Sequence, residues 1–255
     1  MSTATLKLGG VHLAANALLL WVGYEWLGMA ESTGVRLAAS ALYALAILAL
    51  ACWLYGATLV YFRSGGSQLK ESFRIALRHL VPLVAAAAVV IAIYGLSTAN
   101  FLSQPAFETA SFLTLKLHKS VKPSTVMSVF RVLLWIVRWV VLPVALLPMA
   151  SGIATQGWRG FREFTWRASW RYWIAVPVLL AASLTLPRML LGWTPQGTFV
   201  LEFVSFSLRS LFAYVLLVGG LIGLCVVTSL PPWRRVPETA RVVAAASSGK
   251  GAEGG

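Results

Sequence analysis

Charged side chains inside apolar segments are the residues of this sequence best placed to do chemistry. Arg131 and Arg138 lie seven residues apart in such a segment. Glu202 and Arg209 have the same spacing near the start of another. Seven residues put two side chains on one face of a helix, and a charge inside a membrane span indicates a function and a partner. With Glu25, these residues predict a polar network in the outer half of the membrane, which locks helix packing or lines a small cavity. The alternative is that each side chain snorkels separately to the surface.

Two short segments combine arginines with apolar or aromatic side chains at helical spacing. The first has an apolar stripe with two cations beside it: Phe73, Leu77 and Leu80, with Arg74 and Arg78. The second has an aromatic stripe with two cations beside it: Trp166, Trp170 and Trp173, with Arg167 and Arg171. Such segments predict helices that lie in the membrane plane, with rings at headgroup level and guanidinium groups on lipid phosphates. We call them the two elbows. The alternative is that they only supply the basic loops of any multi-pass protein.

Residue sets for catalysis or metal binding are missing from the sequence. It contains no Asp and eight Glu, and its three histidines have no Cys or carboxylate at ligand spacing. Phosphate-binding loops, dinucleotide fingerprints and nucleophile elbows are also missing. Cys52 and Cys225 lie in apolar segments, where a thiol behaves as a small hydrophobe. We therefore predict no enzyme activity, metal or cofactor.

The composition is that of a membrane protein. Of the 255 residues, 58% are hydrophobic and 11% are charged, and the mean hydropathy is +0.78. The formal net charge is +13, but the cations lie between apolar segments and not on one folded face. Anionic lipid headgroups are therefore the predicted counterions, and nucleic acid is not.

Six apolar segments are long enough to cross about 30 Å of hydrocarbon as helices. They are residues 11–29, 37–62, 80–96, 132–153, 173–191 and 206–230. The fold class predicted is an all-α polytopic helical bundle of about six spans, formed by a single domain over residues 1–236. Residues 237–255 are predicted to be a disordered cytoplasmic tail. The first segment is open to a second interpretation, a signal peptide cleaved after Gly28-Met29-Ala30.

The distribution of Lys and Arg predicts the orientation. With both termini in the cytoplasm, 13 of the 21 basic residues lie on the cytoplasmic side. The loop over residues 99–124, which carries Lys116, Lys119 and Lys122, is the main exception. The absence of an appended soluble domain suggests a bacterial cytoplasmic (inner) membrane.

An ungapped offset of 93 residues aligns the chain with itself. It places Ser72–Val81 on Thr165–Ile174 with similar residue types, and it places the flanking spans on each other. We predict two parallel copies of a span–elbow–span unit, over residues 37–98 and 130–191. Gly219 and Gly223 form a small-residue face in the last span and predict close helix packing.

The first elbow, Ser72-Phe73-Arg74-Ile75-Ala76-Leu77-Arg78, resembles elbows of bacterial multi-pass membrane families. These include the membrane domains attached to some glycerophosphodiester phosphodiesterases. The resemblance covers the elbows and the spans that follow them. It implies a membrane module without hydrolase activity, because those enzymes carry catalysis in a separate soluble domain.

The sequence therefore predicts a non-enzymatic integral membrane protein, a scaffold or accessory subunit. Its expected partners are anionic lipid headgroups and other membrane proteins or a second copy of the chain. The alternative is a small transporter in which the repeat supplies two halves and the outer charges line a path.

Overall fold

Helices are the only regular secondary structure among the residues that the structure describes. The computed structural model describes residues 3–30, 32–66, 68–96, 103–118, 120–162, 170–193 and 198–229. The elements are α1 (Thr3–Leu27), α2 (Gly34–Arg63), α3 (Leu69–Arg78), α4 (Leu80–Leu96), α5 (Ser103–Leu117), α6 (Pro123–Ile136), η1 (Val137–Val141), α7 (Leu142–Gln156), η2 (Gly157–Arg162), α8 (Trp170–Leu180), η3 (Ala181–Thr185), α9 (Leu186–Gly192) and α10 (Phe199–Ser229). The predicted tail, residues 237–255, lies outside this part.

The predicted spans are confirmed as helices. Five described helices are long and apolar enough to cross a membrane, and the bent pair α3–α4 makes up to six. The α4 helix has the predicted bounds, whereas α2 and α10 are longer than the predicted spans. The chain is therefore an all-α protein with about six membrane spans.

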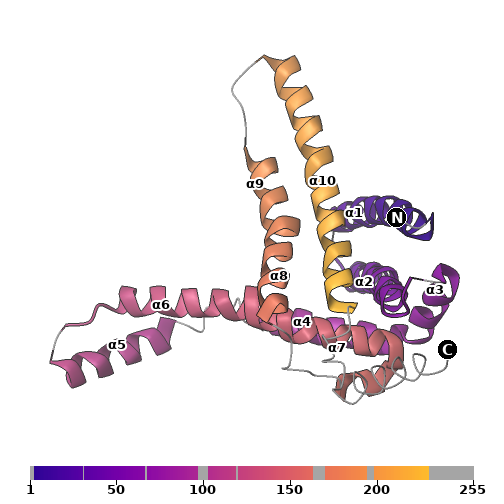
Figure 1. Ribbon diagram of the computed structural model, residues 1–255. Helices are drawn as coiled ribbons and strands as arrows, with labels where there is room; N and C mark the ends of the chain where they lie inside the picture. Colours follow the sequence, from indigo (N-terminus) through magenta and orange to yellow (C-terminus); the bar gives the residue numbers. More distant parts are fainter. Residues whose placement is uncertain are drawn as a thin grey trace, which may run out of the picture.

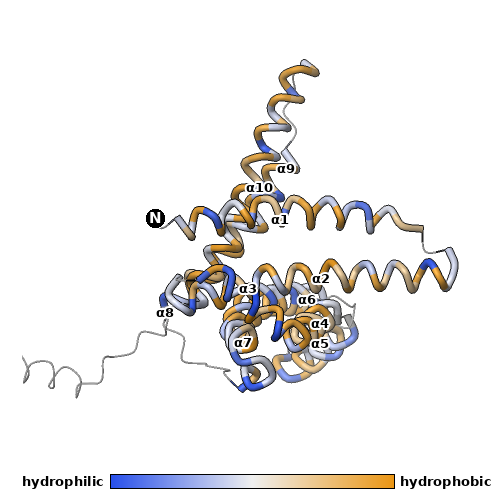
Figure 2. The backbone as a smooth tube through the Cα atoms, turned by 90° about the vertical axis from the view of Figure 1, so that its right-hand side faces the viewer, coloured by the Kyte–Doolittle hydropathy of each residue, from blue (hydrophilic) through white to orange (hydrophobic). Residues whose placement is uncertain are grey.

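Consecutive spans form three antiparallel pairs. The first pair is α1 with α2, the second is α4 with the continuous helix α6–η1–α7, and the third is α8–η3–α9 with α10 (Figure 1). Figure 2 shows α1 and α2 side by side, with apolar residues along both.

One buried cluster, which we call the junction, joins the three pairs. Its core is formed by Leu59, Val60, Leu83, Ala86, Ile153, Ala154 and Cys225. These residues lie near the end of α2, the start of α4, and the ends of α7 and α10. The start of α1 packs on the same stretch of α2, which is buried from Gly56 to Tyr61. Spans that alternate in direction have these helix ends on the same side of a membrane. The structure therefore brings together the helix ends that share one side.

Away from the junction the three pairs diverge, as Figures 1 and 2 show. The buried contact among all three pairs is therefore at the junction. A bilayer keeps spans within about 40° of its normal. We expect the pairs to turn about the junction toward a common direction in the membrane.

The loop predicted over residues 99–124 contains a helix, α5, which the sequence interpretation missed. It packs antiparallel to α6 through Ala106, Ala110 and Val126. The side chains of Phe107 and Phe112 are exposed among polar neighbours, so the apolar periodicity that marks a buried helix is weak here. The region that carries Lys116 and Lys122 is thus a folded hairpin.

Two π-helical turns interrupt the middle spans, and each is followed by a proline. η1 ends two residues before Pro143, and η3 ends two residues before Pro187. A proline lacks the N–H that bonds to the carbonyl four residues earlier, and its ring clashes with that carbonyl. An extra residue in the preceding turn relieves the clash, so the sequence dictates both interruptions.

The 93-residue repeat is matched at one helix end but not at the elbow. Arg63 ends α2, and Gln156, 93 residues later, ends α7. In the first copy the helix breaks at His79, whereas the aligned Tyr172 lies inside the continuous helix α8. Pro82, which follows the break, aligns with Ala175 in the second copy. The two copies therefore differ at this position, and most of the second elbow, residues 163–169, lies outside the described residues.

The glycine face of α10 is shifted by one residue from the prediction. A Cβ atom at Gly219 would meet no atom within 4 Å, whereas one at Gly220 would lie 2.4 Å from the Ser183 Cβ. A Cβ atom at Gly223 would lie 3.4 Å from the Leu179 Cδ2, which is an ordinary contact distance. The expected role of Gly219 in close packing was wrong. The spacing of small residues identifies a helix face, but it does not show which glycine on α10 lies against the π-helical turn η3.

Gly219 and Gly220 give a matched test of this packing. We expect Gly220→Ala to destabilise the fold by about 1–3 kcal/mol, because the added methyl group overlaps Ser183. Gly219→Ala should have no destabilising effect, since that position is open. Thermal unfolding in a mild detergent measures both variants. Equal midpoints would contradict the contact between η3 and α10.

Candidate functional site: the α3 elbow and a buried polar network

The first elbow exists as a separate helix, α3, bent by 69° from α4. The break falls at His79, whose backbone N–H donates to carbonyls at the end of α3 and whose carbonyl accepts from Leu83. Pro82 cannot donate to the carbonyl of Arg78, four residues earlier, so a straight helix through this point is disfavoured. The sequence thus folds α3 against the junction.

Small residues let α3 lie close to α2. Ser72 and Ala76 are buried in this contact. A Cβ atom at Gly56 would lie 3.6 Å from the Ala76 Cβ and 2.7 Å from the Leu83 Cδ1. The Trp53 indole N–H donates to the Phe73 carbonyl at 2.9 Å, and the two rings meet edge to face. The elbow is therefore held by packing and a hydrogen bond.

The opposite face of α3 carries a cationic stripe. Lys70, Arg74 and Arg78 are spaced by four residues and are all exposed. Glu71 forms an ion pair with Arg74 at 4.0 Å, which leaves a net positive face. The neighbouring Leu77 is also exposed, at 54% of its surface. Cations beside exposed apolar side chains are the surface that an interfacial helix presents to a membrane.

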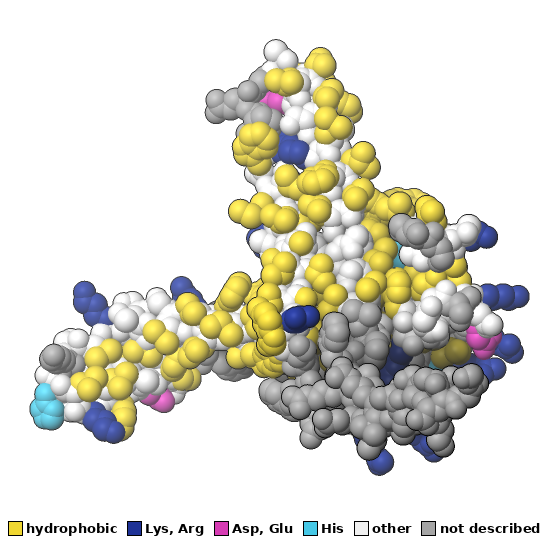
Figure 3. Space-filling view, viewed as in Figure 1, with side chains coloured by type: hydrophobic (Ala, Val, Ile, Leu, Met, Phe, Trp, Pro, Cys, Tyr) yellow, Lys and Arg dark blue, Asp and Glu magenta, His cyan; other side chains and the backbone are white. Residues whose placement is uncertain are grey.

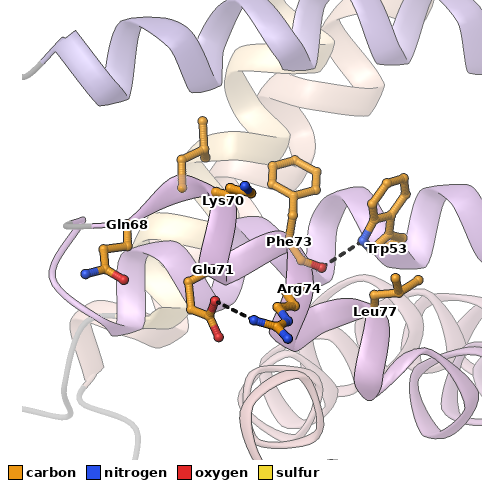
Figure 4. Close-up of a pocket in the computed structure, with 8 residues that line it drawn as sticks. Trp53, Gln68, Lys70, Glu71, Phe73, Arg74 and Leu77 are labelled. Carbon is orange, nitrogen blue, oxygen red and sulfur yellow. Dashed lines mark hydrogen bonds and ion pairs between the residues drawn. The ribbon is translucent and has the colours of Figure 1, made fainter.

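An open hollow of about 630 Å³ lies beside this stripe, between α2 and α3 (Figure 4). It is lined by Trp53, Gln68, Leu69, Lys70, Glu71, Phe73, Arg74 and Leu77. Figure 4 shows Lys70 and Arg74 on α3 next to the aromatic pair of Trp53 and Phe73. A hollow with both cationic and aromatic walls suits a phosphate group and the apolar chain attached to it.

The described part of the second elbow belongs to α8. Trp170 is exposed, and the Arg171 guanidinium lies 6.0 Å from its ring centroid. Trp173 is partly buried against the cluster of Val144, Val176 and Leu224. The predicted lipid contacts of Trp166 and Arg167 fall outside the described residues, so they stay predictions.

The structure does not bring the five predicted network charges together. Glu25 lies in the last turns of α1, Arg131 on α6, and Glu202 in the first turn of α10, on three diverging pairs. Arg209 donates to the carbonyls of Ser205 and Leu190 and stacks on Trp193. Arg138 lies over the Tyr94 ring. A seven-residue spacing pairs side chains on one helix, but it cannot show which helix ends meet.

A polar network that the sequence interpretation missed lies between α1 and α2. His12 and Asn16 come from α1, and Tyr55 and Thr58 from α2. His12 and Thr58 are fully buried. The spacings of four residues on α1 and three on α2 put each pair on one helix face, which was the available signal. The sequence alone does not show that these two faces meet.

The hydrogen bonds of this network fix the donor and acceptor roles. The Thr58 hydroxyl donates to the Leu54 carbonyl at 2.9 Å, so Thr58 Oγ1 accepts from His12 Nε2 at 2.6 Å. His12 Nδ1 is then an acceptor for Asn16 Nδ2, at 3.3 Å. Asn16 Oδ1 accepts from the Tyr55 hydroxyl at 2.6 Å. The arrangement satisfies each of these groups with a neutral histidine, and it attaches α1 to α2.

Tyr55 tests the contribution of this network. Tyr55→Phe leaves Asn16 Oδ1 buried without its donor, which should cost about 1–3 kcal/mol of stability. Tyr43→Phe on the same helix is the control, because Tyr43 has no hydrogen bond among the described residues. The midpoints of thermal unfolding in detergent should separate the two variants. A loss of stability that is the same for both would rule out a specific contribution of the network.

Comparisons of this chain with protein-family models, curated proteins and solved structures gave no match. The resemblance of the first elbow to those of other membrane families therefore stays a prediction. Within the described ranges, no three His, Cys, Asp or Glu side chains gather as a metal site. The α3 elbow is the feature of the structure from which a function can be argued.

Proposed function

We propose that the protein is an integral membrane scaffold or accessory subunit whose α3 elbow binds anionic lipid headgroups. The observation that carries the proposal is the exposed stripe of Lys70, Arg74 and Arg78 on a helix held at the junction. Each cation near an anionic membrane surface contributes about 1 kcal/mol. Because Glu71 pairs with Arg74, the net charge of +2 on α3 supplies about 2 kcal/mol, which favours anionic over zwitterionic lipid.

The placement of apolar and charged surface supports a membrane-bound elbow. In Figure 3 hydrophobic side chains cover the arm formed by α9 and α10, and Lys and Arg gather at the edge near α1 and α3. Phe73 and Leu77 lie next to the cations on α3. In this arrangement the spans lie in hydrocarbon and α3 lies at the headgroup level of one leaflet, the cytoplasmic one in our proposal.

A transporter is the weaker candidate. Its path was expected to be lined by the outer-half charges, but Arg209 is bound to backbone carbonyls and Arg138 packs on Tyr94. The charges are therefore engaged in separate contacts. The two π-helical turns are explained by the prolines that follow them.

The elbow can be tested by charge removal with a matched control. We expect phosphatidylglycerol to raise the unfolding temperature of the wild type more than phosphatidylcholine does. The Lys70→Gln/Arg74→Gln/Arg78→Gln variant should lose most of this difference. The control variant, Lys116→Gln/Lys122→Gln/Arg131→Gln, removes three exposed cations from the α5–α6 hairpin. It should keep the difference in unfolding temperature between the two lipids. Raised salt should weaken the wild-type effect. An equal response of both triple variants would contradict headgroup binding at α3.

The proposed orientation has its own test. Ser64, at the end of α2, and Ser111, on α5, are both exposed and lie on opposite sides in our proposal. Each is replaced by Cys in a Cys52→Ser/Cys225→Ser background. In intact cells with a permeabilised outer layer, a membrane-impermeant maleimide should label position 111 and spare position 64. The reverse pattern would place α3 on the outside.

A further inference from the structure

The hollow between α2 and α3 has a polar end and an apolar end (Figure 4). The first turns of α3 supply its polar wall, with Gln68, Lys70 and Glu71. Its apolar wall includes Leu77 and the ring of Trp53, whose indole N–H donates to a carbonyl of α3 at 2.9 Å. The volume of about 630 Å³ lies in the range of sites for small ligands, about 300–1,000 Å³. A ligand that matches the hollow therefore joins a polar group to an apolar one.

The depth of the hollow in the membrane indicates which molecule meets it. With 30 residues, α2 is about 45 Å long, whereas the hydrocarbon is about 30 Å thick, the length of about 20 helical residues. Counted from the start of α2 at Gly34, the hydrocarbon ends near Trp53. The 17 residues of α4, about 26 Å, are all needed to cross it, and Leu83 in the first turn of α4 packs beside Gly56. Both helices therefore place the hollow where the phosphates of one leaflet meet the hydrocarbon.

The charges of the hollow match a phosphate with a single negative charge. Lys70 and Arg74 are positive and Glu71 is negative, so the lining carries a net charge of +1. A phosphodiester headgroup with one negative charge neutralises it. A phosphomonoester carries about −1.5 to −2 charges at pH 7 and would bring the excess next to the Glu71 carboxylate. A zwitterionic headgroup would leave the positive charge of the lining in place.

Glu71 and Gln68 add hydrogen-bonding groups beside the phosphate position. The Glu71 carboxylate is engaged only by a long ion pair, 4.0 Å from Arg74, and the Gln68 side chain does not cap α3. A carboxylate accepts hydrogen bonds and donates none, so a headgroup that binds here needs a hydroxyl or an ammonium group. Because the net charge of the lining favours an anionic headgroup, a hydroxyl is the donor that fits.

We propose that the hollow binds one phospholipid whose headgroup is a phosphodiester with free hydroxyl groups, such as phosphatidylglycerol. Lys70 and Arg74 bind the phosphate, Glu71 accepts a hydrogen bond from a headgroup hydroxyl, and the start of an acyl chain packs on Trp53. This inference rests on the proposed function and deepens it. It adds a single site of defined headgroup chemistry to the general attraction between α3 and anionic lipid.

Two lipids of equal charge test the site. Phosphatidylglycerol and phosphatidylmethanol are both singly charged phosphodiesters, but only the first has headgroup hydroxyls. Native mass spectrometry of the full-length protein in a mild detergent counts the bound lipids and gives their affinities. We expect one phosphatidylglycerol to bind about fivefold more tightly than phosphatidylmethanol, which lacks the hydrogen bond to a charged group. Glu71→Ala should remove this preference.

Charge variants on one helix separate the site from general attraction. Lys70→Gln should weaken the binding of both lipids about fivefold. Arg78→Gln removes an equal charge one turn beyond Arg74, outside the hollow, and should cause a clearly smaller loss. Lys122→Gln, before α6, should leave both affinities unchanged. All three side chains are exposed, so these variants keep the fold.

Several outcomes would overturn the proposal. Equal affinity of the wild type for the two lipids is one, and an equal loss in Lys70→Gln and Arg78→Gln is another. Displacement of the lipid by glycerophosphoglycerol or inorganic phosphate would assign the hollow to a soluble phosphate compound. Tighter binding of phosphatidylethanolamine than of phosphatidylglycerol would assign the donor to an ammonium group. The proposed function fails separately, if the Lys70→Gln/Arg74→Gln/Arg78→Gln variant keeps the wild-type response to phosphatidylglycerol in thermal unfolding.

Discussion

The close contact of helices at Gly56 is the constraint on which the rest of the structure depends. From Gly56 to Tyr61, α2 is buried, with α1, α3, α4, α7 and α10 packed against it. A Cβ atom at position 56 would require the end of the Leu83 side chain to move and would meet the Ala76 Cβ at an ordinary contact distance of 3.6 Å, so a small residue here lets α3 and α4 both pack closely on α2. The turn after α7 meets the same region, since Gly157, at a φ of +63°, leaves no room for a Cβ against His79. The loops on one side of the spans are thereby fixed to each other.

Different interactions hold the helices together at the junction and at their far ends. Around the junction, small residues and satisfied polar groups such as Ser229, which donates to the Leu59 carbonyl, bring backbones together. Toward the far ends the helices expose long rows of apolar side chains, which gain little from each other when lipid is equally apolar. Pairing there is weak, and a bilayer aligns the spans.

The sequence predicted the features that depend on composition and periodicity, and it failed where geometry between helices decides. Apolar length predicted the spans, and the spacing of Phe73, Arg74, Leu77 and Arg78 predicted the α3 elbow, because both are local properties. The charges of the expected network lie on three different pairs, and a spacing within one helix does not show whether those helix ends meet. The network of His12 and Tyr55 was missed because the sequence shows the polar face of each helix but does not show that the two faces pack against each other. A small-residue pattern likewise identified α10 as a packing helix but gave Gly219 in place of Gly220.

Docking of α3 on α2 is the central claim, and a cysteine pair tests it most directly. A Cβ atom at position 56 lies 3.6 Å from that of Ala76, within the range of a disulfide. In membranes, in a Cys52→Ser/Cys225→Ser background, Gly56→Cys/Ala76→Cys should oxidise to an intramolecular bridge, detected as linked tryptic peptides by mass spectrometry. Gly56→Cys/Arg74→Cys, with one cysteine on the exposed face of α3, should not. No bridge in the first pair, or equal bridging in both, would contradict the account.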